Sequence, residues 1–351
     1  MNNEALQKTL KAPAAVKPRL GFLGVGWIGG NRMEAMVNSG KARARYIADP
    51  VNELALTAKK LAPKAAVLKN LRELLKKTDV EGIVIATPSA LHAEESIMAL
   101  EAGKAVFCQK PLGRNKEEVM RVIEAARKAD RLLGVDLSYR YLNGIQKMKQ
   151  IVNDNGIGHI YAVDLVFHNA YGPDKEWFYN PQLSGGGCVI DLGIHLIDLA
   201  LWMLGYPKAE NITSRLFAKG KAFKDTDNCV EDYAVARIDL EGDTTVNLSC
   251  SWRQSAGRDA VIEASFYGTE GGLSLKNLNG TFYDFKAERY RWTAHETLAE
   301  PPEDWGPGAA LNWIERLAQS TRYDAEIEHI IKVAEVIDAI YGRNTPIKKS
   351  D

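Results

Sequence analysis

The sequence predicts an α/β protein with an N-terminal Rossmann dinucleotide-binding domain, followed by an α+β domain with a large open, mostly antiparallel sheet. Short apolar runs alternate with helical patterns over residues 19–136, which is typical of parallel βαβ units. A glycine-rich motif, Gly24-Val25-Gly26-Trp27-Ile28-Gly29, follows the first apolar run. Beyond residue 160, several segments alternate apolar and polar side chains with period two, as antiparallel strands do. These observations place the Rossmann domain at residues 19–137 and the second domain at 138–351.

The first domain is expected to contain five strands and five helices. Apolar runs predict strands at residues 20–23, 45–48, 82–86, 105–108 and 132–137. Periodic patterns predict helices from the glycine motif to residue 38, over 54–61 and 71–77, from the break at 87–88 to residue 102, and over 115–129. Gly40 and Gly103 end two of these helices, and Asn115 with Glu118 predicts a capping box at the start of the last.

The second domain is expected to gather its helices on one side of its sheet. Alternating patterns predict strands within residues 160–167 and 233–275. Residues 189–204 predict a helix that is apolar on nearly every side, and residues 325–341 predict a last helix before Gly342.

Composition excludes several classes of function. The 351 residues include 45 basic and 45 acidic side chains, so no net charge attracts nucleic acid or an anionic membrane. The longest wholly apolar stretches are far too short to span a bilayer. The four cysteines are widely spaced and form no metal-binding pattern, which favours reduced thiols in a cytoplasmic protein. Residues 1–18 have neither the apolar core nor the cleavage site of a secretory signal, and we interpret them as a flexible arm.

The glycine motif predicts a dinucleotide site. Gly24 permits a tight turn, Gly26 lets pyrophosphate approach the backbone, and Gly29 lets the helix pack closely on the strand. Asp49 lies twenty residues further on, at the end of the second strand, where a carboxylate binds the adenosine ribose hydroxyls. No Arg or Lys follows it directly, so NAD is favoured over NADP. The alternative is that Asp49 is only a turn residue before Pro50.

Lys110 stands between the end of a buried strand and Pro111. Ligands bind at the carboxyl ends of parallel strands in open α/β sheets. An ammonium group there can bind a substrate hydroxyl and favour its deprotonation as hydride leaves. The alternative is a solvated surface lysine, which is what most lysines are.

Asp191 and His195 are four residues apart in the predicted apolar helix, so they are expected on one helix face. Ionisable groups in an apolar helix cost free energy unless they are paired. Gly193 between them leaves room for a close approach, and a histidine titrates near neutrality as a general acid or base does. A buried Asp–His hydrogen bond with only a packing role is the alternative.

With these motifs the chain resembles the Gfo/Idh/MocA oxidoreductase family over about residues 19–346. The matching stretches are the glycine motif, Ile85-Ala86-Thr87-Pro88 with Leu91-His92, Ala102-Gly103-Lys104, Lys110-Pro111, residues 185–195 and Tyr267-Gly268-Thr269-Glu270-Gly271-Gly272. The resemblance implies NAD(P)-dependent hydride transfer between nicotinamide C4 and a sugar, polyol or glycoside carbon. It also implies an open sheet that makes subunit contacts, as in a homodimer or homotetramer.

The resemblance assigns roles by position. Lys110, Asp191 and His195 take the catalytic roles, with His195 as proton acceptor and Asp191 as its orienter and a substrate contact. The residues expected to bind the cofactor are Gly24, Gly26, Trp27, Ile28, Gly29, Asp49, Thr87, Pro88, His92, Gln109 and Lys110. The candidate sugar contacts are aromatic or arginine side chains, each of which has a core or surface role as an equal alternative: Tyr139, Arg140, Trp177, Tyr179, Trp252 and Arg253.

Two departures from the family pattern bear on these roles. The usual Glu-Lys-Pro motif has Gln109 in place of glutamate, which removes a charge next to Lys110. Tyr139 stands where inositol dehydrogenases have an arginine facing the substrate, so inositol is not the expected substrate.

Two alternatives to a dehydrogenase remain open. One is a regulator that senses dinucleotide or sugar without catalysis, although such relatives tend to lose the lysine or the histidine that this chain keeps. The other is a redox-neutral enzyme that cleaves glycosides through transient oxidation by bound NAD.

Overall fold

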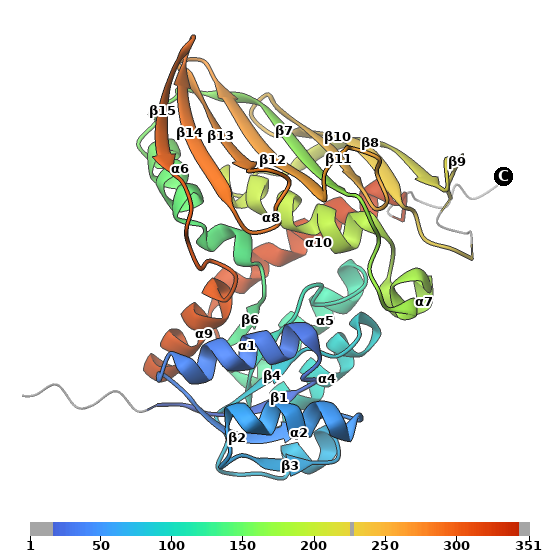
Figure 1. The fold of residues 1–351 in the computed structure, drawn as a ribbon, viewed down its shortest axis with the longest axis vertical. Helices are drawn as coiled ribbons and strands as arrows, with labels where there is room; N and C mark the ends of the chain where they lie inside the picture. The colour runs from blue at the N-terminus through green and yellow to red at the C-terminus, as the bar shows by residue number, and fades with distance from the viewer. Residues whose placement is uncertain (1–16, 225–227, 344–351) are drawn as a thin grey trace, which may run out of the picture.

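The computed structural model describes residues 17–224 and 228–343, so most of the predicted N-terminal arm lies outside the described residues. Two sheets organise the described chain, one parallel and one mostly antiparallel, with helices between them (Figure 1). The predicted α/β fold class is confirmed.

The first sheet has six parallel strands in the order β3-β2-β1-β4-β5-β6. Its strands are β1 (Arg19–Leu23), β2 (Arg43–Ala48), β3 (Ala66–Leu68), β4 (Gly82–Ile85), β5 (Ala105–Cys108) and β6 (Leu133–Val135). Its helices are α1 (Trp27–Asn38), α2 (Asn52–Leu61), α3 (Leu71–Leu75), α4 (Ser89–Glu101) and α5 (Lys116–Ala129). The three-residue edge strand β3 was not predicted from the sequence. The capping box forms only in part, because Asn115 caps the Glu118 N–H while Glu118 binds Arg114 instead of Asn115.

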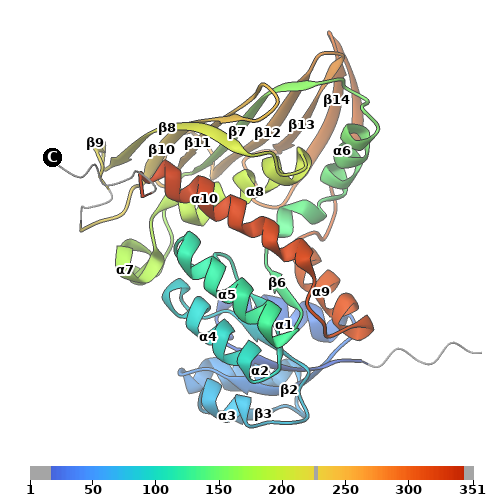
Figure 2. The same ribbon diagram turned by 180° about the vertical axis from the view of Figure 1, so that it is seen from behind.

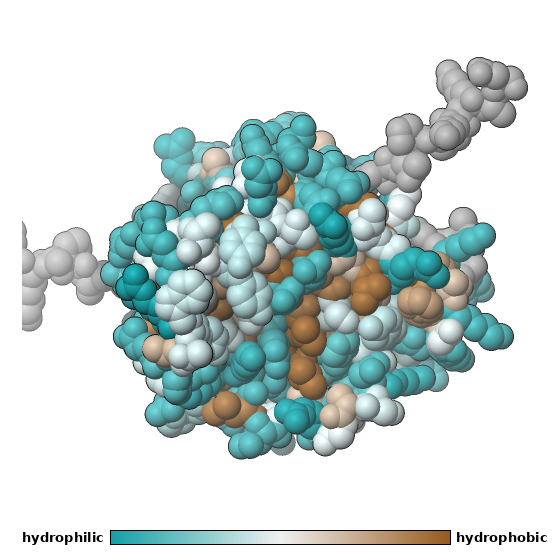
Figure 3. Space-filling model, turned by 90° about the horizontal axis from the view of Figure 1, so that it is seen from above, coloured by the Kyte–Doolittle hydropathy of each residue, from teal (hydrophilic) through white to brown (hydrophobic). Residues whose placement is uncertain are grey.

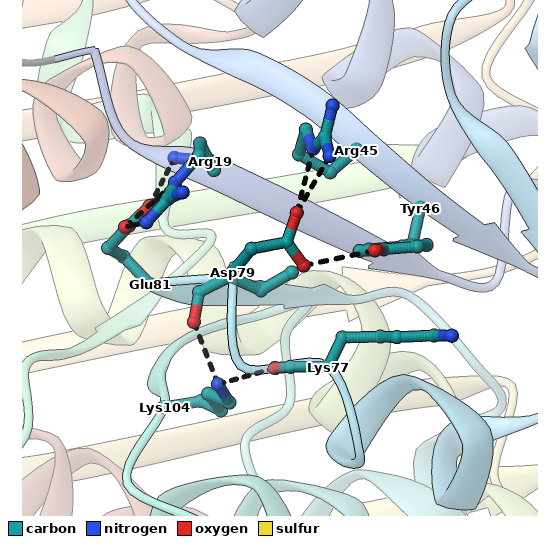
Figure 4. Close-up of polar contacts among 8 residues, drawn as sticks. Arg19, Arg45, Tyr46, Lys77, Asp79, Glu81 and Lys104 are labelled. Atoms are coloured by element: carbon teal, nitrogen blue, oxygen red, sulfur yellow. Dashed lines mark hydrogen bonds and ion pairs between the residues drawn. The ribbon is translucent and has the colours of Figure 1, made fainter.

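Polar side chains close the amino-terminal edge of this sheet (Figure 4). Glu81 pairs with Arg19, and Asp79 accepts hydrogen bonds from Arg45 and Tyr46. Lys104 Nζ donates to two main-chain carbonyl groups, those of Lys77 and Val80, at 2.8 Å each. The predicted site residues lie at the opposite, carboxyl edge of the strands.

The second sheet has nine strands in the order β15-β14-β13-β12-β7-β11-β10-β8-β9. Neighbouring strands are antiparallel except β7 and β11, which are parallel. The strands are β7 (Ile160–Asn169), β8 (Ala209–Ala218), β9 (Lys221–Ala222), β10 (Tyr233–Leu240), β11 (Thr244–Ser251), β12 (Ala260–Gly268), β13 (Gly271–Asn277), β14 (Phe285–Arg291) and β15 (Ala294–Ala299).

Helices cover one face of the nine-stranded sheet, as predicted (Figures 1 and 2). The helices after the first domain are η1 (Ser138–Tyr141), α6 (Asn143–Asn153), η2 (Glu176–Tyr179), α7 (Pro181–Ser184), η3 (Val189–Gly193), α8 (Ile194–Met203), α9 (Gly308–Gln319), η4 (Ala325–His329) and α10 (Ile330–Ile340). The stretch Pro181–Met203 is long and apolar enough to cross a membrane, but 83% of its apolar window is buried beneath the sheet, as in the core of a globular domain.

The boundary predicted after residue 137 does not hold for α9. This helix, from the C-terminal part of the chain, buries Ala310, Trp313 and Ile314 in the same hydrophobic cluster as Leu20 and Phe22 of β1. The sequence analysis assigned residues 138–351 to the second domain because the βαβ pattern ends at 137, but the apolar face of α9 completes the core of the first.

The other face of the nine-stranded sheet carries mixed side chains. A polar row crosses β10, β11 and β7 at Arg237, Asn247 and Asp164, and the next row is Val235, Ser249 and Val166. Figure 3 looks onto this face, which is largely hydrophilic with a narrow apolar strip through its middle.

Candidate active site

The glycine motif forms a turn that only glycine can adopt. Gly24 has a φ of +78°, and a Cβ there would lie 2.6 Å from the carbonyl oxygen of Ala86. A Cβ on Gly29 would overlap the carbonyl oxygen of Gly24, so this glycine lets α1 pack against the turn. Gly26 is the N-cap of α1 without a side-chain cap, which leaves N–H groups for an anionic ligand. Trp27 is 68% exposed beside them, and this arrangement fits the pyrophosphate of a dinucleotide.

Asp49 faces this turn from the end of β2. Its Oδ2 accepts a hydrogen bond of 2.8 Å from the Val25 N–H, and its Oδ1 accepts one of 2.8 Å from the Val51 N–H. The bond from Val51 fits the alternative in which Asp49 is a turn residue. The bond from Val25 ties the carboxylate to the glycine motif. Each oxygen keeps a lone pair for a ribose hydroxyl.

His92 does not face the cofactor groove, contrary to the expectation from the resemblance. It is 1% exposed, and its two ring nitrogens lie 2.7 Å from the carbonyl oxygens of Thr87 and Pro111. Because α4 begins at Ser89, His92 lies one turn into the helix and points toward the loop after β5. His92 therefore fixes the loops after β4 and β5 relative to each other.

Lys110 and Asp191 join the two domains. Lys110 Nζ lies 2.7 Å from Asp191 Oδ1 and 2.7 Å from the Asp191 carbonyl oxygen. The other carboxylate oxygen of Asp191 accepts a hydrogen bond of 3.1 Å from Trp252 Nε1. Both side chains of the ion pair are about 15–17% exposed, so Lys110 is not a solvated surface lysine.

The predicted pairing of Asp191 with His195 is wrong. No hydrogen bond joins them: Lys110 and Trp252 bind the Asp191 carboxylate, and Nδ1 of His195 has no partner among the described residues. The predicted helix over 189–204 begins as the π-helical turn η3, whose wider turn changes the angle between positions four apart.

His195 has a cationic rather than an acidic environment. Burial, together with the positive charges of Lys110 and Arg32, lowers the pKa of His195 well below its usual value. Its Nδ1 is buried without a hydrogen-bond partner among the described residues, while the residue as a whole keeps part of its surface exposed. The ring packs on Tyr139, with 5.1 Å between the ring centroids. His195 is therefore a neutral imidazole beside the Lys110–Asp191 pair.

Of the six candidate sugar contacts, Trp252 binds Asp191, and Tyr179 and Arg253 are linked to Trp252 in turn. The ring of Tyr179 lies 5.6 Å from that of Trp252, and Arg253 Nη2 donates a hydrogen bond of 3.2 Å to the Tyr179 hydroxyl. Trp177 lies in the same short segment, η2, where its ring stacks on Phe178. Trp177, Tyr179 and Arg253 form an aromatic and cationic wall, whereas Trp252 is 3% exposed and belongs to the core, from which it binds Asp191.

The other two candidates are core residues. Tyr139 is buried among aromatic rings, at 4.8 Å from the Trp305 ring and 5.8 Å from that of Phe285. Arg140 pairs with Asp198 and lies over the rings of Trp202 and Tyr206, so these groups engage its guanidinium group. For Arg140 these contacts fit the alternative of a structural role.

Comparison with known sequences decides the family. Residues 18–137 match the sequence model of the oxidoreductase family with an NAD-binding Rossmann fold, and residues 145–274 match the Gfo/Idh/MocA C-terminal domain. The chain belongs to the Gfo/Idh/MocA family.

Members of this family with assigned activities are distant relatives. D-glucoside 3-dehydrogenase of Escherichia coli is 28% identical over 221 residues, which cover 60% of this chain and 63% of that enzyme. The myo-inositol 2-dehydrogenase of Thermotoga maritima is 25% identical over 91% of this chain and 99% of its own. The crystal structure of GenD2 from gentamicin A biosynthesis in complex with NAD superposes with a TM-score of 0.77 at 22% identity, covering 94% of this chain and 95% of that one.

Gln109, which replaces the glutamate of the Gfo/Idh/MocA motif, belongs to a buried hydrogen-bond network. Gln109 Nε2 donates to Asp136 Oδ2, and Gln109 Oε1 accepts the Lys110 N–H at 3.1 Å. Arg32 of α1 pairs with the same Asp136 oxygen at 2.6 Å, and Ser138 donates to the other. Arg32, Asp136 and Ser138 were not predicted as site residues from the sequence. Asp136 directly follows β6 at the carboxyl edge of the sheet. This position is the sequence feature that could have indicated its role in the site.

A second missed carboxylate holds the start of η3. Glu231 is fully buried and accepts hydrogen bonds of 2.9 Å from the N–H groups of Gly187 and Val189, and one of 2.8 Å from the Tyr341 hydroxyl. Burial raises the pKa of Glu231. Gly187 is required here, because a Cβ would overlap the carbonyl oxygen of Glu231. Glu231 thereby positions the turn that carries Asp191.

Proposed function

We propose that this chain is an NAD-dependent dehydrogenase that oxidises a hydroxyl carbon of a sugar, polyol or glycoside, with Lys110, Asp191 and His195 as its catalytic residues. The observation that carries the proposal is the Lys110–Asp191 ion pair at the carboxyl edge of the parallel sheet, beside a neutral His195. The ion pair joins the dinucleotide-binding domain to the aromatic wall of the second domain.

Lys110 is the proposed donor to the substrate oxygen. An ammonium group has three N–H donors, and two of them are directed to Asp191, one to Oδ1 and one to the carbonyl oxygen. The third remains for a substrate hydroxyl. When bound, nicotinamide accepts a hydride at its C4 atom. Lys110 would then stabilise the negative charge that develops on the substrate oxygen as the proton leaves.

His195 is the proposed proton acceptor. A general base must be unprotonated, and burial beside Lys110 and Arg32 keeps the imidazole neutral at physiological pH. The proposed role of Asp191 is to hold Lys110, since it has no bond to His195.

The proposed cofactor is NAD rather than NADP. The Asp49 carboxylate lies beside the turn of the glycine motif, where it would accept bonds from ribose hydroxyls and repel a 2′-phosphate. Thr87, Pro88 and Gln109 follow β4 and β5 on the same edge and are proposed to line the nicotinamide side.

The proposed substrate class follows from the aromatic wall. Sugar rings present C–H faces that stack on aromatic side chains, and hydroxyl groups that an arginine such as Arg253 can bind. The named activities of the relatives, D-glucoside 3-dehydrogenase and myo-inositol 2-dehydrogenase, lie in this class.

A panel of sugars, polyols and glycosides with NAD⁺ and NADP⁺ tests the proposal, with NADH absorbance and product mass as readouts. A dehydrogenase accumulates NADH together with a product two mass units lighter. Glycoside cleavage without net NADH would support the redox-neutral alternative. Dinucleotide binding without any turnover would support a regulator.

We further propose that the protein is cytoplasmic and assembles as a homodimer or homotetramer through the uncovered face of the nine-stranded sheet. The row Val235, Ser249 and Val166 at its centre consists of small or apolar side chains that a second sheet can cover. Light scattering tests the assembly, and Val166→Lys is expected to shift it toward the monomer without loss of helix content.

A further inference from the structure

Lys175 belongs to the second domain but reaches the glycine motif of the first. A Cβ built on Gly26 would lie 3.6 Å from Lys175 Nζ. Gly26 is the N-cap of α1, the position at which a Rossmann domain receives the two phosphates of its dinucleotide. The first turn of α1, Trp27-Ile28-Gly29-Gly30, contains no basic side chain. The cation nearest Gly26 therefore comes from the other domain.

We propose that Lys175 binds the pyrophosphate of the nicotinamide dinucleotide, so that the second domain closes one side of the cofactor site. The inference rests on the proposed function, because it takes the glycine motif as the place where the phosphates bind. An ammonium group forms charge-assisted hydrogen bonds with phosphate oxygens, which are stronger than those of the neutral N–H groups of α1.

The loop that carries Lys175 is held in place by its own contacts. The Tyr179 hydroxyl donates a hydrogen bond of 2.9 Å to the carbonyl oxygen of Pro173, and the Phe178 N–H donates one of 3.2 Å to that of Lys175. A Cβ on Gly172 would overlap the Tyr179 hydroxyl, so glycine lets Tyr179 pack closely on this part of the chain. The base of the loop is thus fixed, which reduces the conformational entropy lost when Lys175 binds a ligand.

The side chain of Lys175 has no competing partner in the part of the chain that the structure describes. Its sequence neighbours Asp174 and Glu176 are exposed and form no ion pair with it. The loop also has a defined position relative to the catalytic pair, because Tyr179 contacts Trp252 and Trp252 donates to Asp191. Lys175 is therefore placed by the same segment that builds the substrate wall.

The test measures binding of NAD⁺, ADP-ribose and adenosine by isothermal titration calorimetry to the wild type, Lys175→Ala and Lys175→Arg. Lys208→Ala is the control, because it removes an exposed lysine of the same domain outside this loop. Lys175→Ala should weaken NAD⁺ and ADP-ribose by the same factor, about tenfold or more, and leave adenosine unchanged. Lys175→Arg should restore most of the affinity. Raising the salt concentration should weaken NAD⁺ binding less in Lys175→Ala than in the wild type.

Unchanged NAD⁺ affinity in Lys175→Ala would overturn the inference and leave the proposed function intact. An equal loss for adenosine would overturn it too, because adenosine has no phosphate. A wild-type protein that binds neither NAD⁺ nor NADP⁺ would overturn the proposed function itself, and the inference with it.

Discussion

The side-chain amide of Gln109 donates a hydrogen bond of 2.5 Å to Oδ2 of Asp136. The carboxylate that the Gfo/Idh/MocA motif places directly before the lysine is thus absent, but a buried carboxylate lies one strand further along the edge of the sheet. Arg32 neutralises it from α1, the helix that begins at the glycine motif. Gln109 is therefore uncharged but binds a buried carboxylate that Arg32 neutralises.

The contact between residues 109 and 136 predicts that Gln109→Glu lowers the stability of the protein. This loss of stability should grow as the pH rises. Two carboxylates within hydrogen-bond distance repel each other when both are ionised. The pKa of one of them would therefore be higher in the folded state. A folded-state pKa above the unfolded value of about 4 means that stability is lost as the pH rises from there toward the raised pKa. Thermal unfolding at pH 5 and pH 8 should show a loss, relative to wild type, that is larger at pH 8.

Two further variants control this experiment. Gln109→Glu combined with Asp136→Asn restores a single carboxylate and should recover most of the lost stability. If Gln109→Glu matches the wild type at both pH values, the two side chains are not in contact.

Lys110→Ala should lower turnover by about a hundredfold or more, since it removes the donor to the developing oxyanion. NAD⁺ affinity should change little, because Lys110 is expected to act on the substrate oxygen. Lys116→Ala is a suitable control, as it removes a lysine of the same domain that pairs with Glu335 on the helical side. Turnover of Lys110→Ala within a few-fold of the wild type would contradict the proposed role.

Asp49→Asn should reduce the preference for NAD⁺ over NADP⁺. The wild type is expected to bind NAD⁺ at least about tenfold more tightly, since the carboxylate repels a 2′-phosphate. An asparagine keeps an oxygen that can accept a hydrogen bond from the Val25 N–H but removes the charge. Asp49→Asn should therefore mainly raise the affinity for NADP⁺. Binding titrations with both cofactors measure this, and equal affinities in the wild type would show that Asp49 does not face the ribose.

The Rossmann half was largely predictable because its signals are local. Gly24 and Gly29 follow a strand and begin a helix within a few residues, and Lys110 directly follows another strand. Period-two alternation predicted the strands within residues 160–167 and 233–275, but it predicted neither β8, β9, β14 and β15 nor the order of the strands. β7 lies between β11 and β12, which come some eighty to a hundred residues later, and nothing local specifies that pairing.

The incorrect predictions about the site also arise from contacts between residues that are distant in sequence. A spacing of four residues suggested an Asp191–His195 pair, but Lys110 and Trp252, both distant in sequence, bind the Asp191 carboxylate instead. The π-helical turn depends on Glu231, which holds the N–H groups of Gly187 and Val189 from a distant segment. Which of several distant residues binds a given side chain cannot be predicted from the residues that flank a motif.

The pH dependence of His195 is the sharpest test of the corrected site. Because burial, Lys110 and Arg32 lower its pKa well below 6.5, the oxidation rate should be flat at neutral pH and fall only at acidic pH, where the imidazole gains a proton. Arg32→Gln removes one of these cations and should move the midpoint upward. Asp191→Asn should slow the reaction through Lys110 and shift the midpoint less than Arg32→Gln does, since Asp191 has no bond to His195. The measurement is the pH–rate profile of each form where a deuterium isotope effect shows that hydride transfer limits the rate. A wild-type midpoint at or above pH 7, or near-normal turnover in His195→Ala, would exclude His195 as the base in this environment.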